Sequence, residues 1–166
     1  SKLQGGYAEI IGGVNKALDA LIGPLYVAAQ YIEQIGRGEI PKPITEEDKG
    51  GFNDIKNSIN SCIEGLGALE EGARVMGLMS LNDYSQDMQG EYHGLYQELA
   101  KSVNLVNYRI RRIMEIMTHV AAGDLSDLQN IIDGGKRSEG DKLVPTLILM
   151  IESIKALVEE TDLLVA

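Results

Sequence analysis

The side chains that most often carry chemistry are few in this chain and too widely spaced to form a recognisable site. His93 and His119 are the only histidines, and the one nearby carboxylate, Glu115, does not complete a metal-ligand set. Cys62 is the only cysteine, so one chain can form neither an internal disulfide nor a multi-cysteine metal site. No Ser/His/Asp, Cys/His or paired-carboxylate arrangement is identifiable by spacing. We therefore expect no catalytic residues, no cofactor or metal ligands and no enzymatic activity.

Two further segments suggest chemistry only superficially. Residues 133–138 resemble a phosphate-binding loop, but they lack a glycine at the required first position and have no strand before them. A flexible connector is the simpler interpretation. Arg109, Arg111 and Arg112 form a basic spot on a predicted helix, where ion pairs with Glu115 or with a partner chain are favoured over contact with phosphate or membrane.

The composition favours a helical bundle with an aliphatic core. Of the 166 residues, 44% are hydrophobic, only 5% are aromatic and none is tryptophan. The net charge of −10 argues against nucleic acid or anionic lipid as a partner. The most apolar stretch, residues 147–151, is too short to span a bilayer, so we expect no direct membrane insertion. Helix-like sequence at both ends indicates a segment of a longer protein, and any anchor would lie outside it.

Apolar residues that recur at alternating steps of three and four keep a stripe facing a partner helix. One such stripe begins at Ile11, and others begin at Phe52, Tyr96 and Leu143. A period in this range indicates an array of repeated units. The stripes predict helices over residues 7–36, 51–77, 91–122 and 141–165.

The segments between these helices, residues 37–50, 78–90 and 123–140, are expected to be connectors. Pro41 and Pro43 forbid a helix in the first, and Gly38 can adopt the positive φ that often ends a helix. We expect Ile40 and Ile44 to pack into a groove between helices, although isolated apolar loop residues are the alternative. The first connector is long enough to run back along a helix and leave its two helices parallel, although a long loop can also lie idle. The Gly23-Pro24 pair predicts a kink inside the first helix, where one unit passes into the next.

Pro24, the Gly38-Glu39-Ile40 turn and Ile44, followed by heptad residues on the next helix, resemble the HAMP domain. The pattern is similar to the tandem HAMP arrays of bacterial methyl-accepting chemotaxis receptors. The third connector keeps a comparable turn, whereas the middle connector matches least well and could have a different geometry. The connector anchors that the resemblance implies are Pro24, Gly38, Ile40, Ile44, Gly77, Met79, Gly123 and Leu125.

The resemblance implies an all-α fold of tandem HAMP-like units that form parallel four-helix coiled-coil bundles in a homodimer. Residues 1–22 would be the second helix of a preceding unit, followed by units at 23–64, 65–107 (divergent) and 108–166. The stripe positions expected in the dimer core are Ile11, Val14, Leu18, Leu21, Leu25, Ala28, Ile32, Ile35, Phe52, Ile55, Ile59, Cys62, Leu66, Leu69, Leu99, Val103, Val106, Ile110, Ile113, Met117, Val120, Leu147 and Ile154.

By the same resemblance, the chain would relay conformational change between the input and output domains of a chemotaxis-type receptor. Its partners would be a second copy of itself and the flanking domains, and it would be a cytoplasmic segment of an inner-membrane receptor. One alternative is a ligand-sensing bundle whose four helices run antiparallel. A passive coiled-coil spacer is another, but a continuous rod needs neither the prolines nor the buried connector residues.

Overall fold

The computed structural model describes residues 2–46 and 51–165, and this part of the chain contains five helices and no strand. The helices are α1 (Lys2–Gly36), α2 (Gly51–Ser80), α3 (Leu95–Ala121), α4 (Asp127–Gly134) and α5 (Leu143–Val165). The all-α fold predicted from the stripes is confirmed. The helices divide into two compact units, Ser1–Asn104 and Leu105–Ala166. Because α3 crosses this boundary, its first residues belong to unit 1 and the rest to unit 2.

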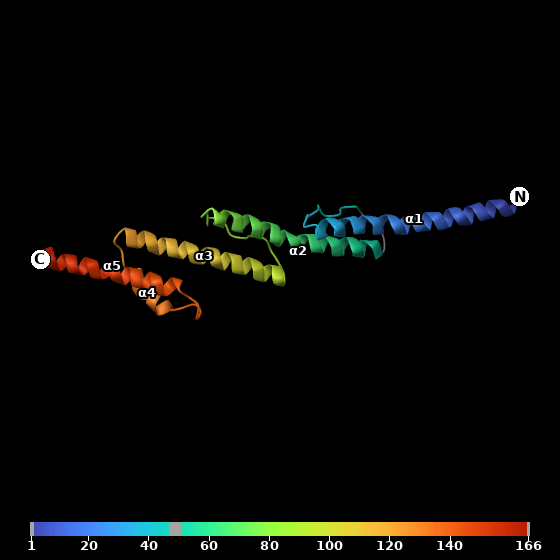
Figure 1. Ribbon diagram of the computed structural model, residues 1–166. Coiled ribbons are helices and arrows are strands. Elements are labelled where there is room, and N and C mark those ends of the chain that lie inside the picture. Colours follow the sequence, from blue (N-terminus) through green and yellow to red (C-terminus); the bar gives the residue numbers. More distant parts are fainter. Residues whose placement is uncertain (1, 47–50, 166) are drawn as a thin grey trace. The chain divides into compact units, whose positions relative to one another are not determined.

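In unit 1, α1 and α2 lie side by side and run in the same direction (Figure 1). Pro24 lines one cavity together with Ile55, near the start of α2. Ile35, at the end of α1, lines another cavity together with Leu66, further along α2. Later residues of α1 therefore meet later residues of α2, as parallel helices require. The antiparallel arrangement of the alternative hypothesis is wrong for this pair.

The first small core lies between these two parallel helices. Its buried residues are Ala28 from α1 and Ile59 and Ile63 from α2. Ile44 from the connector packs against this cluster. Helix α1 continues through Pro24 without ending, although the ring removes one backbone hydrogen bond from the helix.

The second half of α2 forms a second core with the start of α3. Gly65 lies directly under the ring of Tyr96, since an added Cβ would come within 2.6 Å of its Cε2 atom. Further along, Gly72 lies close to Leu99. The order of these contacts makes α2 and α3 parallel as well, as Figure 1 shows. The buried residues of this core are Ala68, Val75, Met88, Ala100 and Val103.

Unit 2 consists of the second part of α3, the short helix α4 and α5. Its core is built on Ile116, Leu147 and Ile151, with Val120 and Ile131 packed against them. Ile151 is fully buried. Burial of a side chain of this size contributes about 2 kcal/mol. This unit therefore has a core that is separate from the two cores of unit 1.

Two sequence predictions about the connectors are wrong. The middle connector was predicted at 78–90, but α2 continues to Ser80 and α3 begins only at Leu95. Gly77 and Met79, expected to be anchors in that connector, therefore lie inside α2. The third connector was predicted to have no helix, yet it contains α4. The Asp133–Gly134 end of α4 also falls within the segment that was interpreted as a flexible connector.

Candidate functional site

The same turn ends α1, α2 and α3. In each case one residue adopts a left-handed backbone: φ is 82° at Gly38, 62° at Asn82 and 83° at Gly123. The N–H of the next residue then bonds back to a carbonyl of the helix, at 3.0 Å for Glu39 to Gln34, 3.0 Å for Asp83 to Leu78 and 2.9 Å for Asp124 to His119. This bonding pattern satisfies carbonyls that a helix end leaves open. The chain therefore contains three copies of one helix-to-connector transition.

An acidic residue follows the left-handed position in all three turns. The Asp83 carboxylate accepts a hydrogen bond from the Ser85 N–H at 3.0 Å, and Asp124 accepts one from the Ser126 N–H at 2.9 Å. Hydrogen bonds from these serines lower the pKa of both carboxyl groups. Ionised carboxylates therefore stabilise the start of the second and third connectors.

An asparagine side chain holds each of the first two connectors against the following helix. The Asn60 Oδ1 accepts a hydrogen bond from the Ile44 N–H at 2.8 Å, and its Nδ2 donates to the Ile44 carbonyl at 3.0 Å. Asn104 makes the same pair with Met88, at 2.8 Å and 2.9 Å. Both pairs join residues that are 16 positions apart. We call these two contacts the amide latches.

The amide latches satisfy both backbone groups of a residue that is also a hydrophobic anchor. Ile44 packs against the first core, and Met88 is only 5% exposed within the second. A connector residue buried in this way has no helix or sheet partner for its own N–H and C=O, so a side-chain amide supplies both bonds. Asn60 and Asn104 were not singled out in the sequence, although their equal spacing from Ile44 and Met88 is a signal that could have identified them.

A carboxylate adds a second attachment to the middle connector. Glu71 on α2 accepts hydrogen bonds from the N–H of Gln89 at 2.9 Å and of Gly90 at 3.2 Å, and from the Tyr92 hydroxyl at 2.7 Å. The hydrogen bond from Gln89, followed by that from Tyr92, lowers the pKa of Glu71. The same carboxylate raises the pKa of Tyr92 to about 12. This arrangement holds Glu71 ionised and Tyr92 protonated at neutral pH.

The third connector is attached by charge. Asp127, at the start of α4, is buried, and its carboxylate lies 2.5 Å from an Arg112 guanidinium nitrogen and 2.6 Å from His119 Nδ1. Arg112 also donates to Glu115 at 3.1 Å. The hydrogen bond with His119 and then that from Arg112 lower the pKa of Asp127, against the opposing effect of burial. We call these three side chains, Arg112, His119 and Asp127, the charged latch.

The other predicted connector anchors differ in how far they are buried. Ile40 is 37% exposed beside Ile35 and Leu66, so it is less buried than expected. Leu125 packs against the core of unit 2. In the middle connector, the left-handed residue is Asn82 and the buried anchor is Met88, neither of which was predicted.

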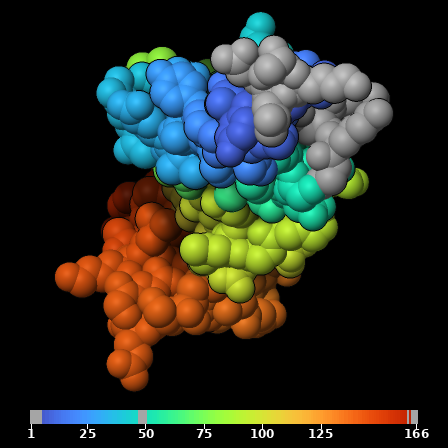
Figure 2. Space-filling model, turned by 90° about the vertical axis from the view of Figure 1, so that its right-hand side faces the viewer, coloured from blue at the N-terminus to red at the C-terminus, as the bar shows by residue number. Residues whose placement is uncertain are grey.

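The residues predicted to form a dimer core fall into two groups. Some are buried within the single chain, namely Ala28, Ile59, Val103 and Leu147. Many others remain largely exposed, including Ile11 at 57%, Leu18 at 47%, Leu25 at 53% and Ile32 at 62%. In Figure 2, which views α1 from its N-terminal end, the surface of α1 lies next to the first residues of α2. The chain therefore presents a long apolar stripe that its own described residues do not cover.

Part of the chain matches a known protein family. Residues 2–68 match the HAMP domain family. The match covers α1, the first connector and the α2 residues that surround the Asn60 latch, which supports a HAMP domain in this part of the chain. HAMP domains are signalling linkers of receptors rather than catalytic domains. No solved structure matches the chain.

Two further observations bear on the expectations from sequence. Among residues 2–46 and 51–165, no group of three His, Cys, Asp or Glu side chains is placed to hold a metal ion. One helical segment, Gly6–Gly36, is long and apolar enough to cross a membrane by length and composition alone, and none of its most apolar window is buried. The expectation that no segment could meet that test is therefore wrong for α1.

Proposed function

We propose that this chain relays conformational change between an input and an output domain of a chemotaxis-type receptor, as a parallel homodimer of tandem HAMP-like units. One observation carries the proposal. Helix α2 is a single helix whose first half packs in the core with Ala28 and Ile44, while its second half packs in the core with Met88 and Val103. Relay between sites needs an element whose position both sites bias. A displacement of α2 in the first core changes the packing of the second.

The repeated turns support the proposed division into units. One copy of this helix-ending turn falls in each of the units 23–64, 65–107 and 108–166, at Gly38, Asn82 and Gly123 respectively. The two amide latches likewise belong to the first two of these units. Residues 1–22 precede the first turn and would be the second helix of an earlier unit.

The exposed stripe on α1 supports a second copy of the chain as the partner. Its apolar residues from Ile11 to Leu25 are about half exposed or more, and they recur at coiled-coil spacing. An apolar surface that continues along a helix marks an interaction site. In a parallel dimer the same positions of two chains would meet, so each stripe would cover the other.

The dimer also gives a reason for the apolar character of α1 other than a membrane. The residues that make Gly6–Gly36 apolar include the heptad positions that a partner helix would cover. We therefore propose that α1 lies in a cytoplasmic bundle of an inner-membrane receptor, and that any anchor lies elsewhere in the parent protein.

Disulfide crosslinking tests the proposal. Cys62 is a free, exposed thiol at a predicted core position of α2. Oxidation of the native chain should join Cys62 to its own copy. In a Cys62→Ser background, Leu18→Cys should do the same on α1, whereas Lys16→Cys, also exposed on α1 but off the stripe, should crosslink much less. A monomeric mass in solution together with no crosslink at either stripe position would overturn the parallel dimer.

A further inference from the structure

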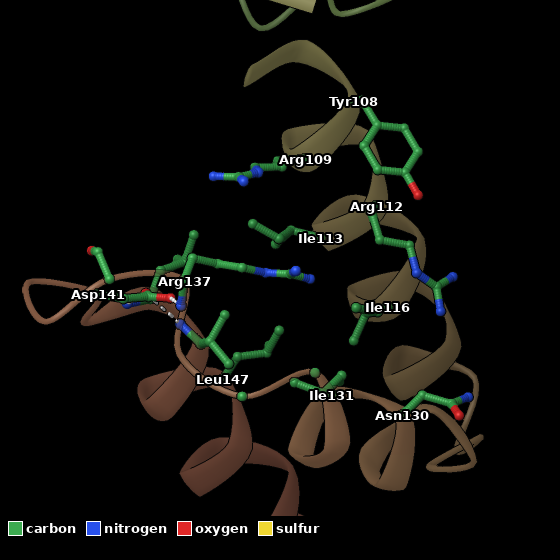
Figure 3. A pocket seen from close by; sticks show the side chains of 15 residues that line it. Tyr108, Arg109, Arg112, Ile113, Ile116, Asn130, Ile131, Arg137, Asp141 and Leu147 are labelled. Atoms are coloured by element: carbon green, nitrogen blue, oxygen red, sulfur yellow. Dashed lines mark hydrogen bonds between the residues drawn. The ribbon is translucent and has the colours of Figure 1, made fainter. Parts of the chain in front are cut away.

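Unit 2 contains a cavity that is formed entirely by residues of this unit. Its volume is about 450 Å³, and it is bounded by α3, α4, the segment that follows α4 and the start of α5. The floor is apolar, formed by Ile113, Ile116, Ile131 and Leu147 (Figure 3). Small-molecule sites have volumes of roughly 300–1,000 Å³ and combine apolar walls with a few polar groups.

Three arginines line this cavity, and two of them form no salt bridge among the described residues, although the charge of Arg137 acts on the nearby Asp141 carboxylate and lowers its pKa. Arg112 is paired with Glu115 and Asp127. For Arg109 and Arg137, no carboxylate lies within ion-pair distance among the described residues. Figure 3 shows Arg137 reaching from the connector toward Ile113, and Arg109 projecting from α3 on the same side of the cavity. Two like charges that face one space repel each other, and an anion between them would relieve that repulsion.

The one carboxylate among the described residues that line the cavity is already engaged. Asp141 accepts hydrogen bonds from the backbone N–H groups of Arg137 at 2.9 Å, Leu143 at 3.0 Å and Val144 at 3.2 Å. It thereby caps the start of α5 and fixes the loop that carries Arg137. The position of the Arg137 backbone is therefore set by the fold before any ligand binds.

We propose that this cavity binds a small amphipathic carboxylate. Its carboxylate group would lie between the guanidinium groups of Arg109 and Arg137, where planar forks of N–H donors match its two oxygens. Its aliphatic part would cover Ile113, Ile116 and Leu147. Because the chain as a whole carries a charge of −10, only a local pair of cations can make an anion favourable here. The proposal does not depend on dimerisation or relay, so it survives if either fails.

Octanoate is a suitable probe, and calorimetric titration of the full chain measures its binding. We expect saturable binding that weakens at least tenfold in Arg109→Gln and in Arg137→Gln. Arg37→Gln, which removes an exposed arginine at the end of α1, should bind octanoate like the native chain. Octanol, with the same chain length but no charge, should bind the native chain at least tenfold more weakly than octanoate.

The location of the bound probe is tested by methyl NMR. Octanoate in the cavity should shift the methyl resonances of Ile113, Ile116 and Ile131, and leave that of Ile59 in unit 1 unchanged. Absence of saturable binding would overturn the proposal. So would equal binding by the arginine variants, or shifts that centre on the exposed Ile11 and Ile32 of α1, since these would mean that octanoate adsorbs to the apolar stripe.

Discussion

The first connector is attached to its helix by neutral hydrogen bonds, and the third connector by contacts of an ionised carboxylate. The first uses the neutral amide of Asn60, which pairs with both backbone groups of Ile44. The third uses the ionised Asp127, held between Arg112 and His119. A neutral amide keeps its hydrogen bonds over the whole pH range, whereas a carboxylate loses its partners when it is protonated. Two connectors that begin with the same turn can therefore respond differently to the same change in conditions.

The middle connector combines both kinds of attachment. Asn104 makes the amide latch with Met88, and Glu71 adds charge-assisted hydrogen bonds to Gln89 and Tyr92. This connector was the one whose sequence matched the expected pattern least well. Its turn and its amide latch nevertheless repeat those of the first connector, with different residue types at the turn and at the anchor.

The largest effect is expected from breaking the amide latches. Asn104→Ala leaves the N–H and C=O of the buried Met88 without partners and should reduce the free energy of unfolding by about 2–3 kcal/mol. Asn60→Ala should have a comparable effect through Ile44. Equilibrium unfolding in urea measures both.

Asn57→Ala is the matched control for these variants, because Asn57 lies on α2, as Asn60 does, but its side chain is exposed. It should change the free energy of unfolding by less than about 0.5 kcal/mol. If Asn60→Ala and Asn104→Ala were as mild as this control, the two contacts would not hold the connectors.

A smaller effect, but a specific one, is expected from acid on the charged latch. The pKa of Asp127 lies below its ordinary value of 3.8, so the stabilisation it gives is complete above that value and is lost as the pH falls through the folded pKa. The protection of the α4 amides against hydrogen exchange, taken relative to their intrinsic exchange rates at each pH, should therefore fall in acid by about 1 kcal/mol, while the protection of the Ile44 N–H should not change.

Asp127→Asn removes the titrating carboxyl group. In this variant, acid should no longer reduce the protection of α4 more than that of the Ile44 N–H. Glu139→Gln, which neutralises an exposed carboxylate in the same connector, should leave that difference unchanged. Equal acid sensitivity of α4 in the native chain and in Asp127→Asn would show that another group is responsible.

The smallest effect is expected where the three turns differ only in residue type. Asn82 has a left-handed backbone, and the other two turns have glycine at the equivalent position. Asn82→Gly should therefore be neutral or stabilise the chain by a few tenths of a kcal/mol, whereas Asn82→Ala should cost about 1 kcal/mol. Thermal unfolding of the pair measures the difference, and an equal midpoint for both variants would argue against strain at this position.

The parts of the fold that could be predicted from sequence are those that depend on periodic apolar residues. The heptad stripes located four long helices, because burying one face of a helix imposes that spacing. The glycine at Gly38 predicted the end of α1 for an equally local reason. The length of the first connector allowed α1 and α2 to be parallel, and the HAMP resemblance implied that they are.

The remaining features depend on long-range contacts that local patterns do not encode. Met88 looks like one of several apolar residues in a polar loop, and only its pairing with Asn104 distinguishes it. Asn82 was not recognised as a turn residue because glycine is the usual choice there. Helix α4 was missed because it is short, and its stability comes from packing of Leu128 and Ile131 on the core of unit 2 rather than from its own sequence.

The shared helix α2 also fixes the rotational phase between the two cores of unit 1. Ile59 and Ile63 point into the first core, and Ala68 and Val75 point into the second, along one rigid axis. Because each residue of an α-helix turns the chain by about 100°, deleting one residue between Ile63 and Ala68 would swing the second pair away from α3. Insertion of seven residues at the same place would nearly restore the original direction. The number of α2 residues between the two cores therefore determines whether both pairs of side chains can be buried at once.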